Sequence, residues 1–150
     1  MFYSGLILGI FGLDMMLKNK VDSLPEEELP REIAGGRITV CRSHNSGMMM
    51  NLLDEKPELV KKLTAGVGIL ALFWYIPQLF RNGNRLIKLG GAMLLGGGAS
   101  NITDHFRRGY VIDYIKCKWK PIRRIAFNLG DLFISLGCVL TLLGSLFQKD

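Results

Sequence analysis

The sequence predicts an all-α membrane protein with four transmembrane helices and a small β-rich region in its loops. Three observations predict this class. The 150 residues, about the length of one domain, are 49% hydrophobic and have a mean hydropathy of +0.24, which small soluble domains rarely reach. The apolar residues gather in four stretches separated by polar gaps. Two of the gaps contain the apolar–polar alternation that is typical of a strand.

The four apolar stretches predict helical spans over approximately residues 2–17, 63–80, 87–103 and 126–147. A transmembrane helix needs about 20 apolar residues, so the second and fourth stretches are good candidates. The other two are short, and a short helix spans where flanking side chains snorkel or the bilayer thins locally. A cleaved signal peptide is a poor interpretation of the first stretch, because it has no basic start and carries Asp14.

The polar gaps differ in character. Residues 18–62 have no net charge and contain a strand-like segment at residues 36–42, after a loop or short turn at residues 24–30. Residues 104–124 hold seven basic and two acidic residues, and their strand-like run covers residues 110–115. The sequence therefore predicts a small amount of β structure in both of these gaps.

The formal net charge of +6 predicts an anionic partner. Lipid head groups fit better than nucleic acid, because the basic residues are not interleaved with exposed aromatics. The cysteines, Cys41, Cys117 and Cys138, are too few for a disulfide framework, and no Cys/His spacing suggests a zinc site. We therefore expect no metal, no cofactor and no nucleic acid, and a classical soluble enzyme is disfavoured.

Ionisable residues inside the apolar stretches are expensive, at about 2.5 to 3.5 kcal/mol each at mid-helix, so each one is a functional candidate. Asp131 is the clearest case. Asn128 precedes it by three residues and Ser135 follows it by four, which puts all three on one helical face. Asn101 and Asp104 repeat the three-residue spacing at the end of the third stretch.

Each charged residue also has a simpler interpretation. A fourth helix that begins nearer Asn128 leaves Asp131 in its first turn, at the favourable end of the helix dipole. Asp104 can cap or solvate the end of its helix. Asp14 and Lys18, four residues apart, can form an orienting ion pair on the first helix.

Taken together, these residues and Asp113 predict a site built on paired carboxylates. Two carboxylates brought close share one proton, because both cannot ionise comfortably. One of them can then activate water while the other protonates the leaving amine, which hydrolyses a peptide bond without a metal. The chain offers no nucleophile elbow, HExxH pair or phosphate-binding loop. His44 and His105 are isolated, which is typical of solvated surface histidines.

Three motifs, in this order, resemble those of bacterial lipoprotein signal peptidase, signal peptidase II. They are Gly96–Asp104, Gly109–Tyr114 and Phe127–Asp131, and the family patterns are GGALGNLxDR, GxVVDF and FNLADS. Two fainter matches, Leu13–Lys18 and Asn45–Met50, resemble LDxxxK and NTGAAF. The resemblance covers most of the chain. It implies a single integral membrane domain over residues 1–150, with a substrate-cradling extracytoplasmic loop at residues 18–62.

The resemblance implies an intramembrane aspartic endopeptidase that removes signal peptides from diacylglyceryl-modified prolipoproteins, cutting before the lipidated cysteine. Asp113 and Asp131 match the catalytic aspartates. The residues that match substrate-binding or supporting positions are Asn45, Gly47, Asn101, Asp104, Asn128, Asp14 and Lys18. The expected partners are the prolipoprotein and membrane lipids, and the expected state is a monomer.

The chain departs from the family patterns at several positions, so it resembles a divergent member. His105 stands where the family has Arg, which removes a permanent charge. Gly130 and Leu132 replace Ala and Ser on either side of the second aspartate. Met48 and Met49 replace two small residues, which would narrow or reshape the pocket.

The distribution of basic residues and the family resemblance predict opposite orientations in the membrane. Residues 18–62 and 104–124 carry eight and seven Lys and Arg residues, against four in the remaining gap and the tail. The positive-inside rule would therefore place them in the cytoplasm. The family has its site at the extracytoplasmic face of the bacterial inner membrane, with both termini cytoplasmic, and we expect this arrangement. The basic third gap would then face anionic head groups.

Two alternatives from other functional classes stay open. One is a catalytically silent membrane protein of the same fold that binds lipidated peptides. The other is a small transporter subunit or scaffold in which Asp14 and Asp131 serve ion passage. Retention of both Asp113 and Asp131 argues against the first, and the clustering of polar residues toward one end of each helix argues against the second.

Overall fold

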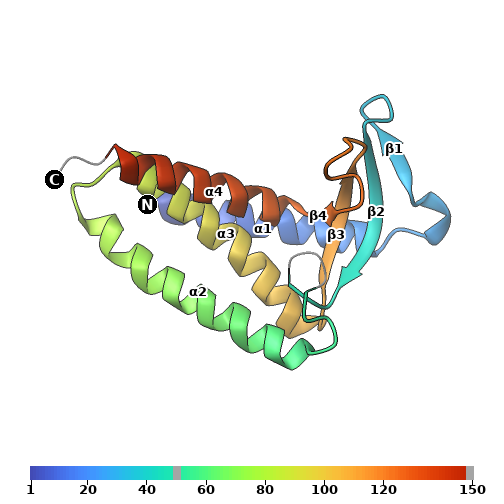
Figure 1. The fold of residues 1–150 in the computed structure, drawn as a ribbon, viewed down its shortest axis with the longest axis horizontal. Helices are drawn as coiled ribbons and strands as arrows, with labels where there is room; N and C mark the ends of the chain where they lie inside the picture. Colours follow the sequence, from blue (N-terminus) through green and yellow to red (C-terminus); the bar gives the residue numbers. More distant parts are fainter. Residues whose placement is uncertain (49–51, 148–150) are drawn as a thin grey trace.

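The computed structural model describes residues 1–48 and 52–147, and in this part of the chain four long helices lie beside one small sheet (Figure 1). The helices are α1 (Phe2–Asp22), α2 (Pro57–Phe80), α3 (Arg85–Arg107) and α4 (Leu129–Leu146). A single 3-10 turn, η1 (Glu26–Glu28), follows α1. The strands are β1 (Arg31–Ile33), β2 (Ile38–Asn45), β3 (Val111–Cys117) and β4 (Ala126–Phe127).

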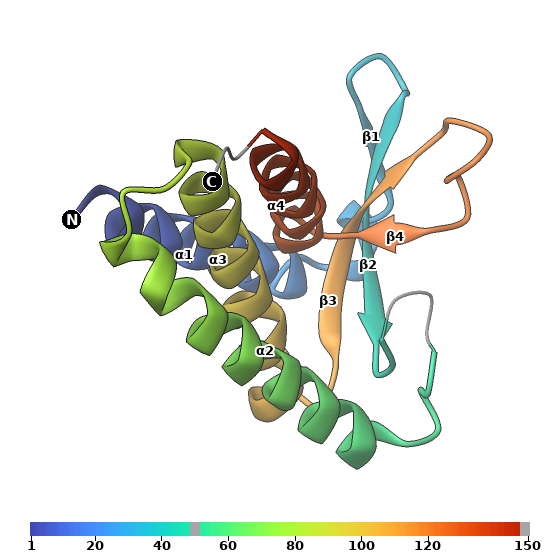
Figure 2. The same ribbon diagram turned by 60° about the vertical axis from the view of Figure 1, so that its left-hand side comes forward.

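The sheet lies across one end of the helices, as Figures 1 and 2 both show. Its strands are antiparallel, in the order β1-β2-β3-β4, and an irregularity in β2 between Val40 and Ser43 shifts the register. Val21 at the end of α1 packs against Ile112 and Tyr114 of β3 in a small buried core. This core fixes the sheet against the ends of the helices.

Helix α3 lies between the other helices and packs against all three of them (Figure 2). Glycines bring α3 and α4 close together. A methyl group added at Gly90 would lie 2.6 Å from the Gly137 carbonyl oxygen, and one added at Gly137 would lie 2.6 Å from the Gly90 carbonyl oxygen. Only a residue without a side chain allows this approach, so these glycines set the spacing of the two helices.

Much of the apolar surface of the helices is exposed. In α2, only Val60 and Tyr75 are buried among the described residues. Two helices, α2 and α4, are long and apolar enough to cross a membrane. Large exposed apolar surface is unusual for a soluble monomer, so the helical part of the chain has the surface of a protein that meets lipid.

The structure confirms the coarse prediction of a helix-rich chain with β structure in its loops. The predicted strands at 36–42 and 110–115 correspond to β2 and β3, and the short turn predicted within 24–30 is η1. Strands β1 and β4 were not predicted, because three and two residues are too few to show alternation.

The predicted helix ends need correction. The first helix continues beyond residue 17 to Asp22, and α2 begins at Pro57 rather than 63, so residues at both ends of the predicted 18–62 loop are helical. The fourth helix begins at Leu129 rather than 126, since residues 126–127 form β4. Hydropathy marks where apolar residues stop, whereas a helix continues through polar residues until a cap ends it.

Candidate active site

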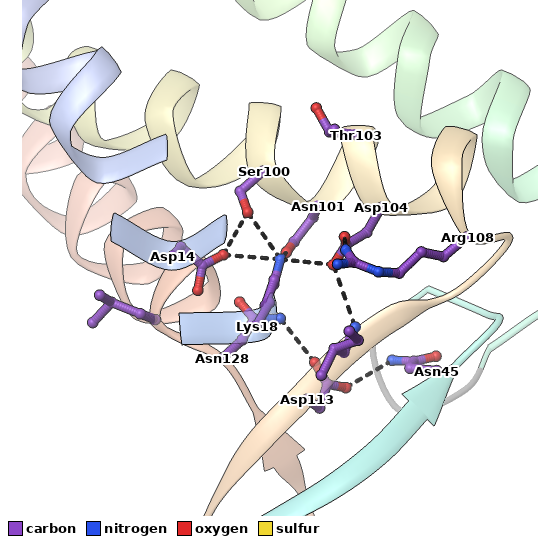
Figure 3. A network of polar contacts seen from close by, with 12 residues as sticks. Asp14, Lys18, Asn45, Ser100, Asn101, Thr103, Asp104, Arg108, Asp113 and Asn128 are labelled. Atoms are coloured by element: carbon purple, nitrogen blue, oxygen red, sulfur yellow. Dashed lines mark hydrogen bonds and ion pairs between the residues drawn. The ribbon is translucent and has the colours of Figure 1, made fainter. Parts of the chain in front are cut away.

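Polar side chains from α1, α3, β2 and β3 meet with Asn128 at the start of α4, where these helices reach the sheet (Figure 3), and Asp131 joins them from α4. Five of them have no solvent-exposed surface, and these are Asp14, Lys18, Ser100, Asp104 and Asn128. Burying charged groups is costly unless they are paired and hydrogen-bonded. The sequence prediction that the polar residues cluster at one end of the helices is confirmed.

Lys18 lies at the centre of this network. Its Nζ lies 2.8 Å from Asp14 Oδ2 and 3.1 Å from Asp104 Oδ2. It also donates to Ser100 Oγ at 2.9 Å and to Asn101 Oδ1 at 2.7 Å. The predicted ion pair between Asp14 and Lys18 is therefore confirmed, and it is fully buried.

Asp104 is buried, so the interpretation of this residue as a solvated helix end is wrong. Its carboxylate contacts Lys18 and the guanidinium of Arg108, the residue directly after α3. It also accepts a bond from the backbone N–H of Ile112 at 3.4 Å, which joins the end of α3 to the start of β3. Two cations, Lys18 and Arg108, thus balance the two carboxylates of Asp14 and Asp104.

Asp113 reaches the site from β3 and is 5% exposed. Its Oδ1 accepts a hydrogen bond from Asn128 Nδ2 at 2.8 Å, and its Oδ2 accepts one from Asn45 Nδ2 at 3.3 Å. Burial, followed by the charge of Asp131, raises the pKa of Asp113 to about 7, and the two amide bonds only partly oppose this. The carboxyl therefore holds a proton close to neutral pH.

Asp131 lies in the first turn of α4, as the simpler interpretation of this residue proposed. Asn128 caps the helix, since it accepts from the Asp131 N–H at 2.9 Å and its own N–H donates to Asp131 Oδ2 at 3.1 Å. Asn101 Nδ2 donates to Asp131 Oδ1 at 2.8 Å. Asn128 is thus outside the helix, and the predicted shared helical face is wrong. Within the described residues, the Ser135 hydroxyl bonds only the Asp131 backbone carbonyl.

Asn128 contacts both aspartates and is itself fully buried. Its amide donates to Asp113, and its amide oxygen and backbone N–H hold Asp131. Neither aspartate is paired with a cation among the described residues. Asp113 is buried and Asp131 is partly buried, and the pair is held by amide donors rather than by an ion pair with any described residue.

Asn45 and Gly47 form the edge of the site at the end of β2. The Gly47 N–H donates to Asn45 Oδ1 at 3.0 Å, and Asn45 Nδ2 is also 3.2 Å from the Met48 carbonyl oxygen. This turn orients the Asn45 amide toward Asp113. Met49 and Met50 of the predicted motif lie outside the described residues.

The two histidines and Gly130 have different settings. His105 is 3% exposed, so the prediction of a solvated histidine is wrong for it. His44 is exposed, as predicted; its Nε2 lies 3.5 Å from Asp22 Oδ1, and its ring stacks on that of Tyr110. Gly130 is tightly packed, since a methyl group there would lie 2.9 Å from Asp14 Oδ2 and 3.1 Å from the Gly97 carbonyl oxygen.

Sequence reasoning missed three residues of the network. Ser100 donates to Asp14 Oδ2 at 2.6 Å, and Arg108 binds Asp104. The hydroxyl of Tyr114 contacts Asp14 and the first turn of α4. The four-residue spacings of Ser100, Asp104 and Arg108 are a helical signal that could have indicated a shared face. Nothing in the local sequence indicated Tyr114.

A family model described as "Signal peptidase (SPase) II" matches residues 6–147, a range that includes the whole network. The chain belongs to the signal peptidase II family. This confirms the resemblance drawn from the three motifs, and with it a protease whose relatives are named for lipoprotein processing. The match covers nearly the full length of the chain, so the family assignment applies to the helices and the sheet together.

Similar proteins with curated names support the signal peptidase II assignment. The chain is 31% identical to the "Lipoprotein signal peptidase" of Allorhizobium ampelinum over 141 residues, covering 93% of this chain and 85% of that protein. It is 30% identical to that of Teredinibacter turnerae over 147 residues, covering 95% and 86%. A solved structure titled as a bacterial membrane enzyme matches with a TM-score of 0.80, covering 97% of this chain and 92% of that one. At 16% identity it shows the fold alone.

Proposed function

We propose that this signal peptidase II is a membrane-embedded aspartic endopeptidase that removes signal peptides from prolipoproteins, with Asp113 and Asp131 as its catalytic pair. The observation that carries the proposal is the position of Asn128, which hydrogen-bonds both carboxylates inside a buried site. The alternative of a silent binding protein is not favoured, because both carboxylates and their amide donors are in place.

The charges of the network support a pair that shares one proton. Lys18 and Arg108 are matched by Asp14 and Asp104, so no buried cation among the described residues is left to neutralise Asp113 and Asp131. Two carboxylates in such a site cannot both ionise, and one of them keeps its proton. With a pKa of about 7, Asp113 is suited to be the protonated partner, although the two groups titrate as a unit.

The proposed reaction follows from this protonation state. The ionised carboxylate accepts a proton from a water molecule, and the water oxygen bonds to the carbonyl carbon of the scissile peptide. The protonated carboxyl donates to the carbonyl oxygen as negative charge develops there. When the C–N bond breaks, the proton held by the pair passes to the leaving amine. As the product C=O forms, one hydroxyl of the tetrahedral intermediate returns its proton to the other carboxylate, so the pair is singly protonated again.

The supporting residues would hold this pair in place. Asn101 links Lys18 to Asp131, and Asn45 holds the outer side of Asp113. Gly47 fixes the Asn45 side chain. Asp14, Lys18 and Asp104 would act indirectly, because they fix the ends of α1 and α3 around the catalytic pair.

We further propose that all four helices span the membrane as one integral domain over residues 1–150. Helices α2 and α4 have the length and composition of spans. Helices α1 and α3 run alongside them (Figure 1) and carry the same network at the same end. The pair then lies near one surface of the bilayer, where water and the chain after the signal peptide can both enter.

The proposed location is the bacterial inner membrane, with the site at its extracytoplasmic face. The distribution of Lys and Arg favours the opposite orientation, so this point needs a direct test. A phosphatase that is active only outside the cytoplasm can be fused after Asp150. The family arrangement predicts an inactive fusion, and an active one would show that the charge bias sets the orientation.

The cleavage reaction itself is tested with purified protein in detergent. A diacylglyceryl prolipoprotein is the substrate, the same prolipoprotein without lipid is the control, and mass spectrometry identifies the new N-terminus. We expect a product that begins with the lipidated cysteine, and much slower cleavage of the control. Folded protein that binds several lipidated substrates without cutting any of them would establish the silent binding protein instead.

A further inference from the structure

The loop between β3 and β4, residues 118–125, is strongly basic and plays no part in the proposed reaction. Its basic residues are Lys118, Lys120, Arg123 and Arg124, and the chain has no Asp or Glu from residue 114 to residue 130. Lys120, Arg123 and Arg124 are exposed. Exposed like charges that are held close together attract an anionic partner.

The turn between β1 and β2 adds to the same surface. The Lys118 N–H donates to the Arg37 carbonyl oxygen at 3.0 Å, which holds the two segments side by side. Lys118 Nζ pairs with Glu32 at 2.6 Å. Arg37, Lys120 and the two arginines of the loop have no ion-pair partner among the described residues, so their charges are free to bind a ligand.

An open cleft of about 390 Å³ lies between these segments, lined by Arg37, Ile38, Cys117, Lys118 and Trp119. Trp119 is 69% exposed and stands between two lysines. The sequence expectation that basic residues are not interleaved with exposed aromatics is therefore wrong at this loop. The cleft combines an apolar wall with a basic edge, which suits a ligand that has both an anionic group and an apolar portion.

The position of the loop indicates which anionic ligand it meets. The loop ends directly before β4, and α4 begins shortly after that strand, at Leu129. In Figures 1 and 2 the β3–β4 loop and the β1–β2 turn extend on the same side of the sheet, past the first turn of α4. Tryptophan and basic residues beside a membrane helix lie at head-group level.

We propose that the β3–β4 loop and the cleft beside it bind the head group of an anionic phospholipid at the membrane surface next to α4. The phosphate would contact Arg123, Arg124 and Lys120, and Trp119 would enter the interfacial layer. A nucleic acid fits less well, because a loop at head-group level faces lipid. The inference rests on α4 crossing the membrane, which is part of the proposed function, but it does not require peptidase activity.

The test measures lipid binding to the full chain in detergent without any substrate. Native mass spectrometry follows the titration of phosphatidylglycerol and, separately, of phosphatidylcholine. The test variant is Arg123→Gln/Arg124→Gln. The matched control is Arg81→Gln/Arg85→Gln, which removes two exposed arginines at the other end of the helices.

We expect the wild type and the control to prefer phosphatidylglycerol, and the Arg123/Arg124 variant to lose at least about fivefold in affinity for it, since each basic group near an anionic surface contributes roughly that factor. Equal binding of both lipids, or an equal loss in the control, would overturn the proposal. Arginine-dependent binding of an oligonucleotide without a preference for anionic lipid would also overturn it. The lipid titration uses no substrate, so its result can be interpreted even if the peptidase assay shows no cleavage.

Discussion

The hydroxyl of Tyr114 donates a hydrogen bond to Asp14 Oδ1 at 2.9 Å, although the two residues are 100 positions apart. The phenolic oxygen of Tyr114 also accepts a hydrogen bond from the Leu129 N–H at 3.1 Å. Burial and the nearby Asp14 charge hold the pKa of Tyr114 above its usual range, so the hydroxyl keeps its proton. One phenol thus joins the ion pair of α1 to the start of α4, which carries Asp131.

Removing this hydroxyl tests the connection. Tyr114→Phe leaves the ring in the core but deprives a buried carboxylate and a helix N–H of their partner. We expect a loss of about 1.5 to 3 kcal/mol in the free energy of unfolding, typical for a hydrogen bond to a charged group, and slower prolipoprotein cleavage. Thermal unfolding in detergent and a cleavage assay measure the two effects.

Tyr110→Phe is the matched control, because the Tyr110 hydroxyl has no hydrogen-bond partner among the described residues and its ring stacks on His44. This variant should unfold like the wild type. Equal stability of Tyr114→Phe and Tyr110→Phe would show that the Tyr114 hydroxyl does not support the site.

Lys18 is expected to be essential for folding of the network. Lys18→Met keeps the length of the side chain but leaves Asp14 and Asp104 without their shared cation in a buried setting. Breaking a buried pair in this way costs about 3 to 5 kcal/mol. The measurement is the unfolding temperature in detergent, with Lys20→Met as the control because Lys20 is exposed on the same helix. A Lys18 variant as stable as that control would contradict the account.

Adjacent glycines of α3 are expected to respond differently to alanine. A methyl group at Gly97 would collide with the backbone of Gly130, next to Asp131, whereas one at Gly98 meets nothing within 4 Å. Gly97→Ala should therefore push the start of α4 away and reduce cleavage by about tenfold or more, since displacements near 1 Å at a reacting centre cost up to about 100-fold. Gly98→Ala should be neutral or slightly stabilising, because alanine favours helix.

Cleavage rates and unfolding temperatures of the two glycine variants give the comparison. If both variants retain full activity, the close approach of α3 and α4 does not position the catalytic pair.

The raised pKa of Asp113 predicts a pH dependence of stability. The unfolded carboxyl ionises near 3.8, while the folded one keeps its proton to about 7. Between these values the folded state binds more protons, so the free energy of unfolding falls as the pH rises. Cleavage should also decline above about pH 7, as the pair loses its shared proton.

Asp113→Asn cannot ionise and removes this contribution. The unfolding temperature of the wild type should fall between pH 5 and 8 by more than that of the variant, within the window between the unfolded and folded pKa values of Asp113. Parallel curves for the two proteins would show that Asp113 has an ordinary pKa in the folded state.

Local spacing accounts for what the sequence could predict. The Asp14–Lys18 ion pair was predictable because residues four apart on a helix are neighbours. The order of the three motifs also grouped Asn101, Asp113 and Asp131 in one candidate site. The strand-like runs of β2 and β3 were long enough to show alternation.

The features of the site that the sequence did not predict depend on contacts between segments that are distant in the chain. Asp104 looked like a solvated helix end, but it is buried because Lys18 arrives from α1 and Arg108 lies directly after α3. The spacing of Ser100 from Asp104 and Arg108 indicates a shared face of α3, but its bond to Asp14 depends on where α1 lies and so had no local signal. Asn128 looked helical because the apolar run begins before it, yet its side chain caps α4.

The most direct test of the central claim is prolipoprotein cleavage by Asp113→Asn and Asp131→Asn beside the wild type. Each variant keeps the size of the side chain and removes the charge and proton that the reaction needs. We expect both to remain folded, to bind lipidated substrate, and to lose cleavage by at least about 1,000-fold, within the range for residues that act as a catalytic unit. Substantial cleavage that survives either substitution would contradict the assignment of these two aspartates as the catalytic pair.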